Sequence, residues 1–346
     1  MRRYLWLACL LTLPLTAHAD VEIDGRRIEV IDVHLHTGTF GRLTTSGRSF
    51  VIGTLPPFAR LYAPALVDHI LDPWYPHLGI RAQTEWAGVD HALLLAVYAQ
   101  NTTAHFENAA LDQLLRSPSN DDWARGMVSI NFEDWDPARL EALDSWLRVH
   151  PDRIVGIKLA HAHQGVAFDD PTYLGVYEVA ARRGVPVLLH TGFSVAPGSR
   201  DEPEFIDPLG LASVIENYDG AHGMGRVDFV LSHVGQGDER ATEHALELAE
   251  EHDNVWLELS ALAHPALVDE RGEPVEDETP QYVYVLDAVQ ERGLIDRTLF
   301  ASDGPQYSGM VRGYVQKIIA AMQDADYSLD DIALVMGANA RTLFFR

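Results

Sequence analysis

The chain has 346 residues, a formal net charge of −25 at pH 7 and 47% hydrophobic residues. This acidic excess disfavours nucleic acid and anionic membrane surfaces as partners, because both carry charge of the same sign. The length fits one large α/β fold as well as two small domains, but no Ser/Gly-rich linker or low-complexity run divides the chain.

Residues 1–19 have the pattern of a secretory signal peptide. Two arginines precede an apolar run, and the Ala-His-Ala that follows predicts cleavage between Ala19 and Asp20. The apolar run is too short to span a membrane, so we expect an exported protein, periplasmic or secreted, with its folded domain over 20–346. Both the general secretory route and the twin-arginine route remain open.

The only cysteine, Cys9, lies inside this predicted signal peptide. The mature chain therefore has no disulfide and no thiolate ligand, and any metal must be held by histidine, carboxylate or modified lysine. Loss of the two leader arginines makes the net charge −27. Among the 26 basic residues only Lys158 and Lys317 are lysines, which makes the position of each informative.

Eight short apolar or β-branched runs predict strands, at 27–36, 90–99, 126–132, 153–160, 185–190, 227–233, 254–260 and 298–303. Amphipathic segments between them predict helices, for example at 136–150, 170–184, 238–252 and 279–293. Strands that alternate with helices indicate a parallel sheet, and eight such units predict a single (β/α)8 TIM barrel.

Two predicted connections are long. Residues 38–82 form an insertion after the first strand, rich in aromatic residues, and 191–210 follow the fifth strand. Long loops on the catalytic face of a barrel usually shape the substrate pocket, and an aromatic cover over the barrel mouth is an equally good interpretation.

Polar residues gather where the predicted strands end. Because side chains alternate along a strand, His34 and His36 point the same way, and we expect both to face the barrel axis together with Asp32. By the same alternation, Ile31 and Val33 should face the helices. The pair His-x-His is weak evidence alone, but later strands end in Lys158, His190, His233 and Asp303. This convergence predicts a metal site, with Zn²⁺ the best match and Mn²⁺ or Fe²⁺ also suitable.

The motifs DVHLHTG, VGIKLAH, VPVLLHTG, LSHVGQG, FASDGP and MGANARTLFF, in this order along nearly the whole mature chain, resemble the amidohydrolase superfamily. The nearest branch is the amidohydrolase-related group that includes the 2-amino-3-carboxymuconate-6-semialdehyde decarboxylase-like enzymes. This resemblance implies that His34, His36, His190 and Asp303 are metal ligands. It also implies that Asp303 shuttles protons and that His233 either binds a second metal or polarises substrate.

Lys158 separates two versions of the site. In binuclear relatives a lysine at the end of the fourth strand is carboxylated by CO₂ and bridges two metals, so the resemblance allows one or two ions per chain. In mononuclear relatives the lysine is unmodified, and a buried lysine paired with aspartate is the alternative. His161 and His163 follow Lys158 at odd-numbered positions, so an extended strand would direct them to the opposite face, and we expect both to be loop residues.

Two further carboxylates are expected to support the ligands. The seventh predicted strand has an apolar face at the odd positions of 255–259, which directs Glu258 and Ser260 to the axis. Glu258 would act behind a ligand or as a general base, and pairing with Lys158 or a histidine is the alternative. Asp32 is expected to orient a ligand.

The expected activity is hydrolysis of an amide, lactone or ester of a small molecule, by water that the metal activates. A non-oxidative decarboxylase of an unsaturated or aromatic acid is the rival, and its marker would be a pocket arginine, for which the candidates are Arg42, Arg48, Arg60 and Arg200. A non-catalytic metal- or ligand-binding barrel is the third alternative. A homo-oligomer is compatible with each, and the sequence does not identify the substrate.

Overall fold

The computed structural model describes residues 20–37, 43–54, 60, 78–102, 104–118, 120, 122–194, 196, 198–262, 281–305 and 309–345. The predicted signal peptide and most of the aromatic residues predicted after the first strand lie outside these ranges. Within them, no helix has the length and apolar character that crossing a membrane requires.

Eight parallel strands form one sheet in the order β3-β4-β7-β8-β9-β10-β11-β12. They are β3 (Ile31–His36), β4 (His91–Leu95), β7 (Ala124–Val128), β8 (Ile154–Leu159), β9 (Val187–Gly192), β10 (Phe229–Gln236), β11 (Val255–Glu258) and β12 (Thr298–Leu299). The segment after β12 pairs with β3, because the N–H of His36 donates to the carbonyl of Gly304 over 2.8 Å. The sheet therefore closes into the predicted TIM barrel.

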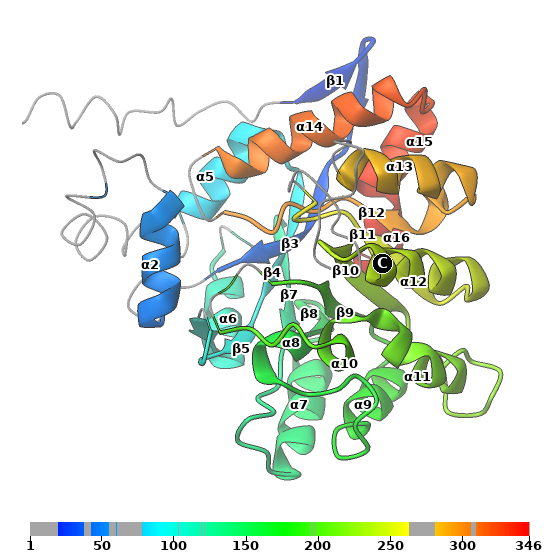
Figure 1. The fold of residues 1–346 in the computed structure, drawn as a ribbon. Coiled ribbons are helices and arrows are strands. Elements are labelled where there is room, and N and C mark those ends of the chain that lie inside the picture. The colour runs from blue at the N-terminus through cyan, green and yellow to red at the C-terminus, as the bar shows by residue number, and fades with distance from the viewer. Residues whose placement is uncertain are drawn as a thin grey trace, which may run out of the picture.

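Helices follow the strands and surround the barrel (Figure 1). Those between or after strands are α5 (Leu78–Ala87), α6 (Asn108–Leu115), α7 (Ala138–Val149), α9 (Gly175–Arg183), α11 (Ala212–Asn217), α12 (Glu239–Glu251), α13 (Gln281–Glu291) and α14 (Met310–Asp324). Further helical segments are α2 (Thr45–Thr54), α8 (His161–Gln164), α10 (Pro203–Ile206), η3 (Pro208–Leu211) and η4 (Ile295–Arg297). The chain finishes with α15 (Leu329–Ala333), the π-helical turn η5 (Leu334–Ala338) and α16 (Asn339–Phe344).

Two layers of apolar side chains hold the barrel together. An inner cluster contains Ile31, Val33, Leu93, Leu95, Met127, Leu188, Val230, Leu299 and Ala301 from the strands. Neighbours in sequence, such as Leu94 and Leu189, pack with helix residues in the outer layer. Helix α16 contributes Leu343 and Phe344 to the inner cluster and closes the amino-terminal end of the barrel. The carboxyl ends of the strands are thereby left as the face for a site.

The first barrel strand departs from strict alternation. Its register with β4 shifts between Asp32 and Leu35, which marks a β-bulge. The expectation that Ile31 and Val33 face the helices is wrong, since both pack inside the barrel. Asp32 pairs in register with Ala92, whose side chain belongs to the outer layer, so Asp32 does not share the face of Ile31 and Val33. The bulge brings His34 back to the interior.

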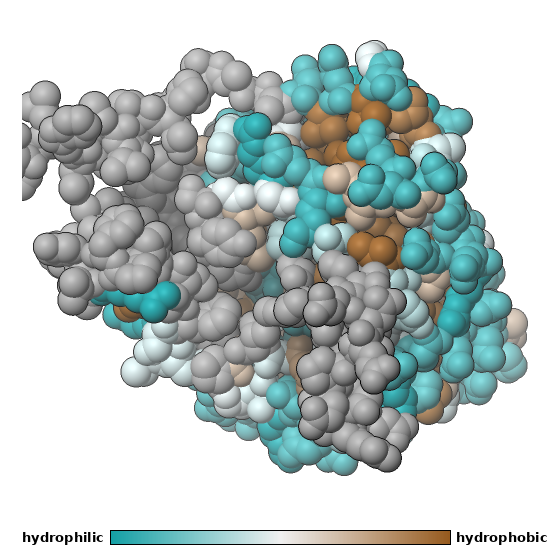
Figure 2. Space-filling view, turned by 45° about the horizontal axis from the view of Figure 1, so that its top comes forward, coloured by the Kyte–Doolittle hydropathy of each residue, from teal (hydrophilic) through white to brown (hydrophobic). Residues whose placement is uncertain are grey.

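Smaller differences lie at the strand ends. The predicted strand 90–99 breaks at Ala96, after which β5 (Val97–Ala99) forms a hairpin with β6 (Ala104–Phe106). Ahead of the barrel, β1 (Val21–Ile23) and β2 (Arg26–Ile28) form another hairpin. Outside the grey residues, Figure 2 shows a mostly hydrophilic surface with apolar residues in patches between polar ones, as the net charge predicts.

Candidate metal centre

The predicted ligands from the first and last strands meet at the carboxyl end of the barrel. Nε2 of His36 lies 2.9 Å from Oδ1 of Asp303, and Nε2 of His34 lies 3.3 Å from the same oxygen. These three donors are within 4.8 Å of one another. Two imidazole nitrogens and a carboxylate oxygen form a donor set that suits Zn²⁺, Mn²⁺ or Fe²⁺.

The hydrogen bonds of His34 show why a cation fits this group. Nδ1 of His34 lies 3.0 Å from Oε2 of Glu258, so the ring proton is on that nitrogen when Glu258 is ionised. Nε2 is buried and has no hydrogen-bond partner. Its lone pair then faces the Asp303 carboxylate oxygen, and a positive ion between the two removes the repulsion. The orphaned nitrogen is the observation that favours a metal here.

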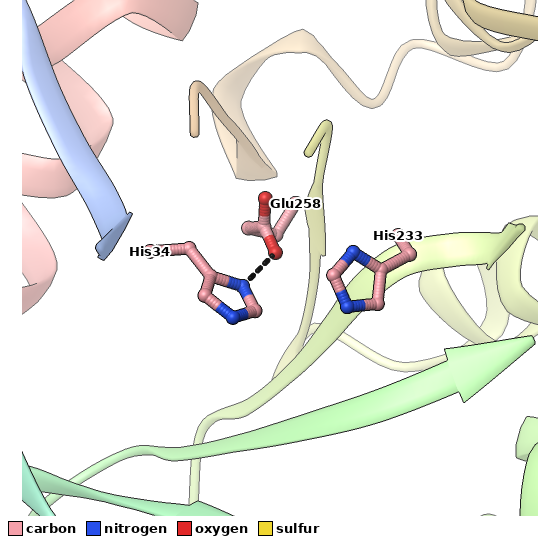
Figure 3. Close-up of side chains that lie close together, drawn as sticks. All are labelled: His34, His233 and Glu258. Atoms are coloured by element: carbon pink, nitrogen blue, oxygen red, sulfur yellow. Dashed lines mark hydrogen bonds and ion pairs between the residues drawn. The ribbon is translucent and has the colours of Figure 1, made fainter. Parts of the chain in front are cut away.

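A second group of donors lies deeper, where Nδ1 of His34, Glu258 and His233 also come within 4.8 Å of one another (Figure 3). Here the polar atoms already have partners. The hydroxyl of Ser260 lies 2.8 Å from Nδ1 of His233 and 3.0 Å from Oε2 of Glu258. The backbone N–H of Ser260 donates to Oε1 of Glu258. This second group is a satisfied hydrogen-bond network, whereas the first retains an unpaired nitrogen.

His190 and Lys158 lie nearby but outside both groups. The ring of His190 is 4.7 Å from that of His233, and its buried Nε2 lacks a hydrogen-bond partner. Nζ of Lys158 has one hydrogen bond to a described residue, the hydroxyl of Ser232 at 3.4 Å. Glu258 and Asp303 both interact electrostatically with Lys158, which agrees with the alternative of a buried lysine near an aspartate.

Burial controls the charge states of the site. It lowers the pKa of His34, His190 and His233, which are therefore neutral and keep a lone pair available at pH 7. Burial also lowers the pKa of Lys158. Burial opposes ionisation of Asp303 too, but His34 and His36 outweigh it and hold its pKa below the usual value. Asp303 is thus an anion beside the imidazoles of His34 and His36.

Asp32 lies behind the ligands, as predicted. Its Oδ1 accepts from the backbone N–H groups of His34 and Ser302, both over 3.1 Å, and its Oδ2 accepts from the Ser302 hydroxyl over 2.6 Å. Burial raises the pKa of Asp32 to about 7, and these hydrogen bonds oppose the rise. The carboxylate of Asp32 thereby connects the backbone of His34, in β3, to Ser302, the residue before Asp303.

Two side chains at the site had no role in the sequence-based prediction. Ser260 was placed on the correct face, but its contact with His233 was not foreseen. His163 was expected to be a loop residue; it lies in α8 with its ring 5.1 Å from that of His190, and Nδ1 lies 2.7 Å from the hydroxyl of Thr102. From the sequence alone, a histidine that follows a strand cannot be identified as either a loop residue or a residue that contacts the site.

The arginines proposed as carboxylate binders receive no support. The guanidinium of Arg200 pairs with Glu202 over 3.1 Å and stacks over the ring of Phe205. Arg42 lies outside the described residues. Arg48 is half-buried in α2, and Arg60 is exposed.

Comparison with known proteins agrees with the geometry. The family model described as Amidohydrolase matches residues 31–346. No curated protein matches the sequence.

Solved structures share the fold at low sequence identity. A probable 2-pyrone-4,6-dicarboxylic acid hydrolase from Acinetobacter baumannii, with citric acid bound, is 14% identical with a TM-score of 0.59, over 92% of this chain and 100% of that one. A dihydroxybenzoic acid decarboxylase from Polaromonas sp. JS666, with bound manganese and 2-nitroresorcinol, is 16% identical with a TM-score of 0.58, over 92% and 97%. An amidohydrolase from Burkholderia multivorans with bound zinc is 14% identical with a TM-score of 0.55, over 91% and 98%.

Proposed function

The chain belongs to the amidohydrolase family, and from this premise we propose that it is a metal-dependent hydrolase that cleaves an amide, lactone or ester bond of a small molecule. The observation that carries the proposal is the pair His34 and Asp303, in which a buried lone pair faces a carboxylate oxygen at 3.3 Å. His36 completes this group, and His190 adds another unpaired nitrogen nearby.

A divalent metal held by His34, His36, Asp303 and His190 would supply a Lewis acid that makes water nucleophilic at neutral pH and polarises a carbonyl. Zn²⁺, Mn²⁺ and Fe²⁺ all suit this set, and the neighbours with bound zinc and manganese support this range. A second ion would need Lys158 as its carbamate together with His233. Burial lowers the pKa of Lys158 to about 8, which makes the free amine that CO₂ carboxylates more accessible and supports that version.

Asp303 is the residue that moves the proton in this proposal. Its carboxylate is ionised, lies on the open side of the group with 22% of its side chain exposed, and can take a proton from the attacking water. It then delivers that proton to the leaving nitrogen or oxygen. His233 lies beside the same space, with its Nδ1 turned towards Ser260.

The competing activity is non-oxidative decarboxylation, which one of the similar structures has by name. It would use the same donors but requires a cationic partner for the substrate carboxylate, and Arg200 is engaged elsewhere. An exported location, which we also propose from residues 1–19, favours hydrolysis because decarboxylation of catabolic intermediates is usually cytoplasmic.

Metal analysis with a substrate panel tests the proposal. The purified mature chain is assayed against lactones, N-acyl amides and aromatic carboxylates before and after chelation. Hydrolysis that is lost on chelation and restored by Zn²⁺ or Mn²⁺ is the expected result. Release of CO₂ from an aromatic acid would instead establish the decarboxylase, and tight metal binding without turnover would establish a binding protein. Two ions per chain and a mass gain of one CO₂ on Lys158 would establish the binuclear site.

A further inference from the structure

We propose that Glu258 and Ser260, at the carboxyl end of β11, are positioning residues that hold both His34 and His233 as Nδ1–H tautomers. His34 lies in β3 and His233 in β10, so the end of β11 determines which ring nitrogen carries the proton in each of these histidines. As a consequence, Nε2 of His233 carries a lone pair and is a hydrogen-bond acceptor in the site.

The number of protons around Ser260 leads to this assignment. Its Oγ lies 3.0 Å from Oε2 of Glu258 and 2.8 Å from Nδ1 of His233, but a hydroxyl has only one proton. When Glu258 is ionised its carboxylate can only accept, so the Ser260 hydroxyl donates to it. The remaining contact then requires that Nδ1 of His233 carries a proton and donates to Oγ. With Glu258 ionised, any other arrangement leaves two lone pairs in contact inside the barrel.

The backbone of Ser260 gives an independent argument. Its carbonyl oxygen lies 3.4 Å from Nδ1 of His233, and a carbonyl can only accept. Its N–H donates to Oε1 of Glu258 over 2.6 Å, which fixes the carboxylate relative to the hydroxyl. All three residues are at most 2% exposed, so water does not replace these bonds.

Glu258 acts on His34 in the same way. Its Oε2 accepts from Nδ1–H of His34 over 3.0 Å (Figure 3). This leaves Nε2 of His34 without a proton, 3.3 Å from Oδ1 of Asp303. Hydrogen bonds of this kind orient metal-binding histidines and typically change metal affinity 10–100-fold when removed. The assignment also excludes a cation among the Nδ1 atoms, because these atoms carry protons.

The catalytic consequence rests on the proposed function. A neutral His233 with its proton on Nδ1 cannot donate a hydrogen bond to a developing oxyanion. It can only accept a hydrogen bond at Nε2, from water or from a donor group of the substrate, while its Nδ1–H stays bonded to Ser260. This replaces the substrate-polarising role that the family resemblance implied.

Nitrogen NMR of the full mature chain, labelled with ¹⁵N at histidine and measured after chelation, tests the tautomers without reference to turnover. We expect pyrrole-type Nδ1 and pyridine-type Nε2 for His34 and His233. Ser260→Ala should make the Nε2–H tautomer of His233 detectable, and Ser260→Thr, which keeps the hydroxyl, should restore the original pattern. Ser129→Ala removes another buried hydroxyl and serves as the matched control.

Zinc titration against a chromophoric chelator provides the second measurement. Glu258→Gln should weaken zinc binding about 10–100-fold, and zinc should shift Nε2 of His34 while its Nδ1 proton remains. The proposal is overturned if Nδ1 of His233 is unprotonated in the unsubstituted chain or if zinc displaces the Nδ1 proton of His34. An unchanged spectrum in Ser260→Ala would remove the Ser260 hydroxyl from the proposal and leave its backbone carbonyl as the acceptor. Absence of hydrolase activity would count against the proposed function alone.

Discussion

Asp303 and His233 share an unusual backbone conformation. Their φ angles are 56° and 68°, in the left-handed region that few non-glycine residues adopt. Such angles cluster at functional sites, where the surrounding structure holds them in place. His233 lies within β10, where the register with β9 shifts, and Asp303 lies in the segment that follows β12.

Asp303→Asn should abolish turnover while metal content falls little. The amide oxygen can still contact the metal, but the side chain can no longer carry a proton. Asparagine is one of the residues that tolerate the left-handed region, so the fold should be kept. Activity assays with metal analysis on the same sample check this, and full activity would contradict the proton-transfer role.

His161 should make the protein sensitive to acid. Burial lowers its pKa to about 4, whereas the unfolded chain has a pKa near 6.5. Between these values the unfolded chain binds the extra proton, so the free energy of unfolding falls as the pH falls from about 6.5 to 4, with a slope near 1.4 kcal/mol per pH unit from this residue.

Replacement of His161 by phenylalanine removes that proton site. Its ring already packs between Phe132 and Phe168, so an aromatic substitute suits the space. Urea unfolding at several pH values should show a shallower pH dependence for His161→Phe. Equal slopes in the two proteins would mean that His161 is protonated in the folded state.

At the scale of elements, sequence patterns predicted each barrel strand because buried parallel strands are continuous apolar runs. Helices such as α7 and α12 lie within two residues of their predicted bounds at each end. The bulge in β3 could not be predicted, since an extra residue in a strand leaves the apolar pattern almost unchanged. The interior position of His34 was therefore correct although the alternation behind it was not.

Of the candidate site, the residue types at the strand ends were predictable, because chemistry restricts which side chains bind metals. Their contacts were not. The hydroxyl of Ser260 contacts His233, whose φ angle is positive. Neither this backbone conformation nor the direction of the hydroxyl can be read from the sequence. His163 reaches His190 only because α8 turns back over the barrel.

The ends of β9 and β10 meet too closely for any side chain at Gly192. A Cβ there would lie 2.2 Å from the backbone nitrogen of Gln236, and φ is +78°. We expect Gly192→Ala to destabilise the protein by several kcal/mol and to displace His190 from His233, which zinc affinity would report. Gly184→Ala has a similar φ of +61° but open space, and should cost only about 1–2 kcal/mol.

Equal effects of the two substitutions on urea unfolding would show that backbone conformation, rather than the contact between β9 and β10, limits position 192. Zinc affinity unchanged in Gly192→Ala would show that the donors do not depend on the register of these strands.

At the scale of the whole molecule, the metal and the barrel should stabilise each other. Because the donors span β3 and the segment after β12, only the closed barrel binds the ion tightly. Free metal at 100 times its dissociation constant would then add about 2.7 kcal/mol to the free energy of unfolding. Thermal unfolding with and without chelator measures this. The midpoint of a His36→Ala variant should hardly respond, and an equal response would place the stabilising ion elsewhere.

The closure between β3 and the segment after β12 has a consequence for biogenesis. His34 and Asp303 are separated by almost the whole chain, so no partly synthesised or threaded chain presents a complete donor set. The ion is acquired in whichever compartment the chain folds, from the metals available there. If the chain is exported as we propose, the identity of the ion in protein purified from its native cell would record where folding took place and would distinguish export of an unfolded chain from export of a folded one.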